Sequence, residues 1–179
     1  MPHAIETQRL LLRPYAEADI ARAFALFETD AEVYRFDPGF ARTQEQRDAI
    51  IRRLMADNQN DGEGTLAVTL KSNGELFGQA GLQLYMLPWQ PFATPEVELY
   101  YKFGREHWGK GYALEACRAL VDFAFDEMRL LRLVTITQPD NARSLGLLRQ
   151  LGFSIGPAPD AWQPHVVGIL TNPAAGPRS

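Results

Sequence analysis

A glycine-rich segment at residues 104–111 constrains the fold of this chain more than any other stretch. It follows a strand-like run, residues 97–103, and precedes an amphipathic stretch that we expect to form a helix over residues 111–128. Glycines let a backbone come close to a ligand, and the first N–H groups of a helix have no partner within the helix. Because the positive end of the helix dipole lies behind those groups, the segment predicts a binding site for an anion such as a phosphate.

The segment has three interpretations. Gly104, Gly109 and Lys110 have the spacing of the GxxxxGK nucleotide-triphosphate loop, but Gly111 stands where that loop has the Ser or Thr that holds magnesium. A plain glycine-rich turn before a core helix would have the same composition. The third interpretation rests on the longer pattern WGKGYALEA, residues 108–116.

Residues 108–116 resemble the W-G-K-G-Y-A-x-E-A signature of the ribosomal-protein N-terminal acetyltransferases, a subgroup of the Gcn5-related N-acetyltransferase (GNAT) superfamily. The general superfamily pattern is Gln/Arg-x-x-Gly-x-Gly/Ala. With Gly111 and Ala113 in its last two places, Trp108 departs from the first place, although Trp is usual there in the subgroup. Glu115 also fits the signature, but an acidic residue on the surface of a helix often has no functional role.

Two other stretches carry the same resemblance. Residues 7–14, TQRLLLRP, followed by Asp19, are similar to the T-x-R-L-x-L-R-x opening of the subgroup, although arginines on an edge strand are often simply solvated. The second hallmark, N-x-x-S leading to L-x-x-x-G-F, is matched by Asn141, Ser144, Leu148, Gly152 and Phe153.

The resemblance implies one domain over residues 1–179 with an α+β (mixed α/β) GNAT fold. Its sheet is expected to be mixed, mostly antiparallel and splayed, with about six to seven strands and about four helices. Residues 172–179 are expected to be a flexible tail. Periodicity and turn signals predict strands over residues 8–14, 65–71, 75–84, 96–103, 131–137, 153–155 and 163–171, and helices over residues 16–28, 43–57, 111–128 and 141–152.

The strand over residues 96–103 brings acidic side chains next to the glycine-rich segment. Period two places Glu96, Glu98 and Tyr100 on one face of the strand. The other face has Val97, Leu99, Tyr101 and Phe103. The two carboxylates are either part of a reaction site beside the anion loop or ordinary solvated acids.

The resemblance implies that the sheet admits the pantetheine arm of acetyl-coenzyme A, whose thioester an amine then attacks directly. Glu98 is our candidate base, and a backbone N–H of residues 98–101 would stabilise the thioester oxygen. Ser144 would donate a hydrogen bond to the departing thiolate, with Tyr100 in reserve. The expected cofactor-binding residues are Arg105, Trp108, Gly109, Lys110, Gly111, Tyr112, Ala113 and Asn141, of which Arg105 and Lys110 would neutralise phosphates and Asn141 would hold the pantetheine amides.

Composition excludes several other classes. The net charge of −4 and the lack of a basic run argue against nucleic acid as a partner. The single cysteine, Cys117, excludes an internal disulfide and a cysteine-cluster metal site, and the three histidines have no ligand-pair spacing, so we expect no metal. No apolar run approaches about 18 residues and no signal sequence is apparent, so we expect a cytoplasmic protein without a membrane partner.

These observations predict an acetyl-coenzyme A-dependent N-acetyltransferase whose partner is an amine acceptor. A catalytically silent module that binds acyl-coenzyme A or a protein partner, and a nucleotide-phosphate binder, are the alternatives. The acceptor stays open between a peptide amino terminus and a small-molecule amine, and a homodimer also stays open. Residues 34–43 and 85–95 are expected to wall the acceptor pocket, the latter either as a lid or as a packing patch.

Overall fold

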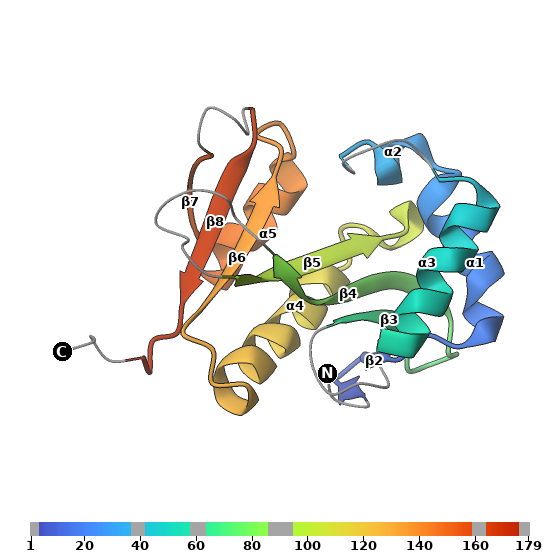
Figure 1. Ribbon diagram of the computed structural model, residues 1–179, viewed down its shortest axis with the longest axis horizontal. Coiled ribbons are helices and arrows are strands. Elements are labelled where there is room, and N and C mark those ends of the chain that lie inside the picture. The colour runs from blue at the N-terminus through green and yellow to red at the C-terminus, as the bar shows by residue number, and fades with distance from the viewer. Residues whose placement is uncertain (1–3, 37–41, 58–63, 86–94, 159–163, 176–179) are drawn as a thin grey trace.

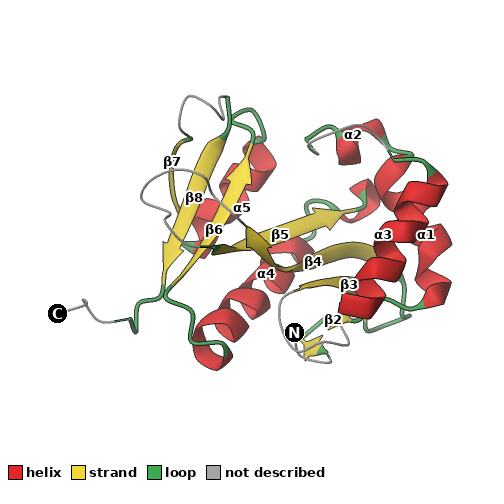
Figure 2. Ribbon diagram, in the orientation of Figure 1, coloured by secondary structure: helices red, strands yellow, loops and turns green. Residues whose placement is uncertain are grey.

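The computed structural model describes residues 4–36, 42–57, 64–85, 95–158 and 164–175, which form a single sheet with helices on both faces (Figures 1 and 2). The strands are β1 (Ile5–Glu6), β2 (Leu10–Arg13), β3 (Gly64–Leu70), β4 (Leu76–Tyr85), β5 (Glu96–Phe103), β6 (Arg132–Thr137), β7 (Ser154–Pro157) and β8 (Val166–Thr171). The helices are α1 (Ile20–Glu28), α2 (Ala31–Tyr34), α3 (Gln44–Asp57), α4 (Tyr112–Asp122) and α5 (Ala142–Leu151). Short turns of 3-10 helix precede α1 and α4, and α4 continues into a π-helical turn at Phe123–Glu127.

The sheet is mixed and mostly antiparallel, as predicted. Its strand order is β1-β2-β3-β4-β5-β6-β8-β7, and only β5 and β6 are parallel neighbours within the described residues. These two strands share one aligned pair, Glu98 with Val134, whereas β4 and β5 are aligned over eight pairs. The two strands diverge toward their carboxyl ends, so the sheet is splayed between β5 and β6 (Figure 1).

The two larger apolar cores of the described residues lie on opposite faces of the sheet. Helices α4 and α5 cover one face, and α1 and α3 cover the other (Figure 2). Alternation along the strands feeds both cores: Leu66 and Val68 of β3 pack under α4, while Ala67 between them packs under α1 and α3. On β5 the predicted alternation is confirmed, since Leu99 and Phe103 belong to the α4 core.

Local signals set several element ends as predicted. The β3–β4 hairpin turns at Gly74, which has φ +73° and donates its N–H to Leu70 O at 2.8 Å. Thr43 and Gln46 form the reciprocal capping box of α3, with hydrogen bonds of 2.9 and 3.3 Å. Gly152 ends α5 at φ +93°.

The structure also differs from the expectations. The described residues form eight strands and five α-helices, against the expected six to seven strands and about four helices. The additional elements are the two-residue strand β1 and the single turn α2, neither of which was predicted. Residues 172–175 do not form a free tail at their start: Asn172 is buried, and its backbone N–H and side-chain amide donate to Leu131 O and Leu130 O. Residues 37–41, 86–94 and 176–179, which include parts of both expected acceptor walls, lie outside the described residues. None of the described helices is both long and apolar enough to cross a bilayer.

Candidate active site

A cleft of about 1240 Å³ runs along the splay between β5 and β6. Its lining comes from β5 and β6, from the glycine-rich loop and the start of α5, and from α2 and α3. The expected site residues that line it are Glu98, Tyr100, Trp108, Gly109, Gly111, Tyr112, Ala113, Asn141 and Ser144. Arg105 and Lys110 do not line it.

The glycine-rich loop has the backbone geometry of an anion site. Gly109 and Gly111 have φ of +75° and +78°, in the left-handed region that glycine adopts at little energetic expense. Gly111 is the N-cap of α4, whose first helical hydrogen bond runs from Glu115 N–H to Gly111 O. The N–H groups of residues 112–114 precede that bond, and these three residues line the cleft. The loop therefore presents N–H groups that have no partner within the helix, together with the positive end of the helix dipole, at the cleft.

Trp108 fixes the loop to the sheet and is itself covered by an arginine. Its indole N–H donates to Phe103 O at 2.8 Å, and the guanidinium of Arg143 lies 4.5 Å from its ring centroid. Arg143, at the start of α5, lines the cleft and was not singled out from the sequence. Arg105, by contrast, is largely exposed, lies 3.9 Å from Asp30 and does not line the cleft.

Glu98 lines the cleft and lies opposite Val134, in the aligned pair that β5 and β6 share. Its carboxylate accepts the backbone N–H of Ile136 at 3.4 Å. Burial raises the pKa of Glu98 to about 7, against this hydrogen bond. A carboxyl group with that pKa can take up a proton near neutral pH, which suits a general base.

The other acid on this strand face has a structural role. Glu96 is 5% exposed, and its carboxylate is bound by both Arg132 Nε, at 2.9 Å, and Arg132 Nη2. This pair joins β5 to β6 at the closed end of the splay. Neither Glu96 nor Glu98 is therefore an ordinary solvated acid.

The two tyrosines of β5 lie on opposite faces of the sheet. Tyr100 shares the face of Glu98, and its hydroxyl accepts the side-chain N–H of Gln79, which in turn accepts the hydroxyl of the buried Tyr15. Tyr101 faces α5, and its hydroxyl lies 2.7 Å from Ser144 Oγ. The partner of Ser144 is thus Tyr101, which was not among the predicted site residues, although period two along β5 already placed it opposite Tyr100. Burial raises the pKa of Tyr101 above its usual value, so its hydroxyl stays protonated at neutral pH.

Asn141 and Ser144 begin α5 at the edge of the cleft. Asn141 Oδ1 accepts the backbone N–H of Ser144 at 3.1 Å, which makes it the N-cap of the helix. The capping bond uses the side-chain oxygen and orients the amide N–H₂ group. The oxygen of Asn141 therefore caps the helix, while its N–H₂ group can serve the expected role of binding pantetheine amides.

Other basic residues line the cleft besides Arg143. Arg42, Arg47 and Arg53 line it from α3 and the segment before it, and Lys102 lines it from β5. Arg42 and Arg47 both pair with the buried Glu28 of α1, and Glu32 of α2 also lines the cleft, so part of this positive charge is neutralised. Glu98, Tyr100 and Lys102 share one face of β5.

Comparison with known proteins agrees with this geometry. Residues 9–154 match the acetyltransferase (GNAT) domain family. The chain is 29% identical over 150 residues to the uncharacterized N-acetyltransferase p20 of Bacillus licheniformis, a match that covers 82% of this chain and 80% of that protein. The crystal structure of an acetyltransferase from Agrobacterium tumefaciens strain C58 has a TM-score of 0.78 at 29% identity, over 95% of this chain and 94% of that chain.

A more distant structure has the same fold. The ribosomal L7/L12 alpha-N-protein acetyltransferase RimL, in complex with coenzyme A, has a TM-score of 0.74 at 14% identity, over 94% of this chain and 97% of that chain. The family match covers most of the chain, from the residue before β2 to the first residue of β7. The chain therefore belongs to the GNAT acetyltransferase family.

Proposed function

We propose that the protein transfers the acetyl group of acetyl-coenzyme A directly to a primary amine. The observation that carries this proposal is the cleft itself, which joins the glycine loop, the splay and Glu98 in one continuous space. The coenzyme A complex of RimL, whose fold is similar, supports coenzyme A as the ligand of the loop. Arg143 and the N–H groups at the start of α4 would hold its phosphates.

The side chains of the cleft divide the reaction between them. Glu98, directly or through a water molecule, takes the proton from the acceptor ammonium. The amine nitrogen then bonds to the thioester carbon, whose oxygen is stabilised by a backbone N–H of residues 98–101. As the carbon–sulfur bond breaks, the amine nitrogen loses its second proton to the departing thiolate, which leaves as the thiol of coenzyme A. The hydroxyl of Ser144 donates a hydrogen bond to that sulfur, and Tyr101 orients the hydroxyl.

The pKa of Glu98 favours some acceptors over others. An α-amino group has a pKa of about 8 and a lysine side chain about 10.4. A base with a pKa of about 7 therefore takes a proton from an α-ammonium at a smaller free-energy cost than from a lysine ammonium. We therefore propose a peptide amino terminus, in preference to an alkylamine whose pKa is near that of lysine, as the acceptor.

Mass spectrometry of an acceptor panel incubated with acetyl-coenzyme A tests the proposal. We expect a mass increase of one acetyl group on α-amino peptides, and less on amines whose pKa is near that of lysine. Coenzyme A at a hundredfold excess over its dissociation constant should stabilise the protein by about 2.7 kcal/mol. Stabilisation without transfer to any acceptor would identify a silent acyl-coenzyme A-binding module. Stabilisation by ATP with magnesium, and none by coenzyme A, would identify a nucleotide binder.

A further inference from the structure

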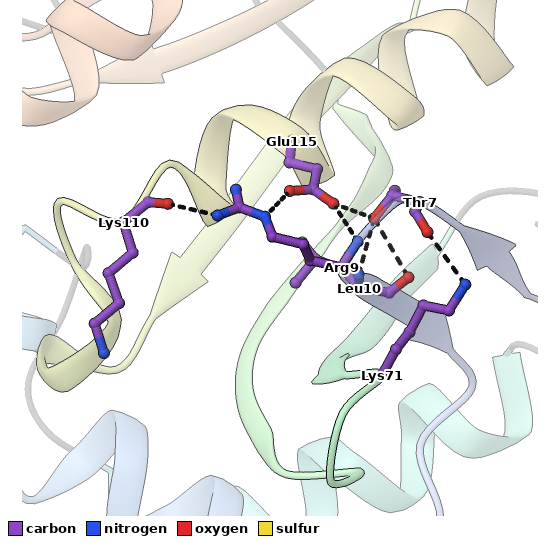
Figure 3. Close-up of polar contacts among 6 residues, drawn as sticks. All are labelled: Thr7, Arg9, Leu10, Lys71, Lys110 and Glu115. Carbon is purple, nitrogen blue, oxygen red and sulfur yellow. Dashed lines mark hydrogen bonds and ion pairs between the residues drawn. The ribbon is translucent and has the colours of Figure 1, made fainter.

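An arginine from the amino-terminal segment lies against the glycine loop. Arg9, in the connection between β1 and β2, donates from Nη1 to Lys110 O at 3.1 Å and from Nε to Glu115 Oε2 at 2.6 Å (Figure 3). Its guanidinium also lies 4.5 Å from the ring centroid of Tyr112. Arg9 does not line the cleft, whereas Gly111 does, so Arg9 contacts the loop from outside the cleft.

Glu115 holds Arg9 in this position. Its second oxygen, Oε1, accepts Thr7 Oγ at 2.6 Å and the backbone N–H of Arg9 at 2.8 Å (Figure 3). Burial would raise the pKa of Glu115, but the hydrogen bonds from Thr7 and Arg9 outweigh it and hold that pKa below its usual value. The carboxylate is therefore charged at neutral pH and ties the connection before β2 to the first turn of α4.

The bond from Arg9 to Lys110 O fixes the direction of one peptide group in the loop. In a planar trans peptide, the C=O of Lys110 and the N–H of Gly111 point in opposite directions. Because Arg9 holds the C=O on its own side, the N–H of Gly111 is turned to the other side, away from Arg9. Gly109 and Gly111 lie on either side of Lys110, and glycine allows many backbone conformations, so the loop by itself would not fix this peptide.

We propose that Arg9 is a positioning residue that keeps the Lys110–Gly111 peptide oriented for binding the diphosphate of coenzyme A. This inference rests on the proposed function, since it concerns the same ligand. Arg9 acts through the loop and not by touching the phosphates. The planar guanidinium is required because its Nε and Nη1 atoms bond a carboxylate and a carbonyl at the same time. A lysine ammonium has a single nitrogen and does not reproduce these two bonds.

Calorimetric titration with coenzyme A tests the proposal on R9A and R9K. The matched control is R22A, because Arg22 also bonds one backbone carbonyl, Leu76 O, and one carboxylate, that of Glu75, and its side chain is 40% exposed against 43% for Arg9. We expect R9A and R9K to weaken coenzyme A binding about tenfold, the factor that corresponds to the loss of a single charge-assisted hydrogen bond. R22A should bind coenzyme A as the parent protein does.

A truncated acyl donor separates positioning from general destabilisation. S-acetylpantetheine lacks the nucleotide diphosphate, so its kcat/KM should be the same in R9A and the parent protein, while KM for acetyl-coenzyme A rises and kcat does not change. Equal losses with both donors, or unchanged binding of coenzyme A by R9A, would overturn the proposal. If R9A does not fold, R9K decides by the same measurements. A parent protein that does not bind coenzyme A would refute the proposed function itself.

Discussion

The hydroxyl oxygens of Tyr101 and Ser144 lie 2.7 Å apart, in a hydrogen bond that joins β5 to α5 beside the splay. Either hydroxyl can be the donor in this pair. If Tyr101 donates to Ser144, the proton of Ser144 is free to point at a ligand in the cleft. The pair then supplies one oriented donor for the departing sulfur, at a position where a lone serine hydroxyl would rotate.

Removal of either hydroxyl should therefore lower turnover through the same step. We expect S144A to reduce kcat by about 10–100-fold with little change in the KM for acetyl-coenzyme A, and Y101F to reduce kcat less. Because the two groups act as one unit, the double variant should be no slower than S144A. Y100F is the comparison, since Tyr100 bonds Gln79 on the opposite face and its effect should add to that of S144A. Additive effects of Y101F and S144A would contradict a coupled pair.

The pKa of Glu98 predicts the pH dependence of the reaction. Because burial raises this pKa to about 7, kcat/KM should rise with pH up to an inflection near 7 and then level off as Glu98 becomes fully ionised. E98Q should lose that inflection and should be impaired more at neutral than at alkaline pH, where more of the acceptor is already unprotonated. Steady-state rates from pH 5.5 to 9.5 measure this directly. An inflection near 7 that persists in E98Q would remove Glu98 from the role of base.

The same pKa makes a prediction about stability that does not depend on activity. The folded protein holds the proton of Glu98 more tightly than the unfolded chain does, because the pKa of this side chain is about 7 in the folded state and 4.5 in the unfolded state. Protonated Glu98 therefore favours folding fully below pH 4.5, and this contribution is lost as the pH rises through about 7. The difference amounts to about 3 kcal/mol at pH 8, at 1.36 kcal/mol per pKa unit.

Denaturant unfolding of E98Q at pH 4.5 and pH 8 tests this sign. The variant should match the parent protein at the lower pH and exceed its stability at the higher pH. Glu96, two residues away on the same strand face, provides the control, because E96Q breaks the ion pair with Arg132 and should destabilise the protein at pH 8. Equal stability of E98Q and the parent protein at both pH values would mean that Glu98 is not buried as a high-pKa acid.

The sequence predicts those parts of the fold that depend on neighbouring residues. The turn at Gly74 and the capping box of Thr43 and Gln46 are each set within a few positions, and the period of β5 needs only its own residues. The two-residue strand β1 and the single turn α2 are too short to show any period, and both depend on the elements that they pack against.

The site was predictable to the same extent. The glycines of the loop and the acid Glu98 follow from local pattern and family resemblance. The pairing of Tyr101 with Ser144 spans 43 positions and that of Arg9 with Lys110 spans 101, so neither follows from any local pattern. Arg105 shows the converse: it is close to the loop in sequence, yet it points to Asp30 and not into the cleft.

Substitutions of Gly146 should affect the stability of α5 and the free volume of the cleft in different ways. It lies in the interior of the helix, lines the cleft, and a Cβ added there would meet no protein atom within 4 Å. Glycine in a helix interior is less favourable than alanine by about 1 kcal/mol, so G146A should raise the melting temperature of the unliganded protein by about 2–4 °C.

G146L should fill part of the cleft, and we expect it to abolish the thermal stabilisation by coenzyme A while the protein remains folded. Gly156 of β7 is the matched position, because a Cβ there also meets nothing within 4 Å but lies outside the cleft lining, so G156L should leave the response to coenzyme A unchanged. A G146L variant that coenzyme A stabilises as it does the parent protein would show that the ligand does not pass along this face of α5.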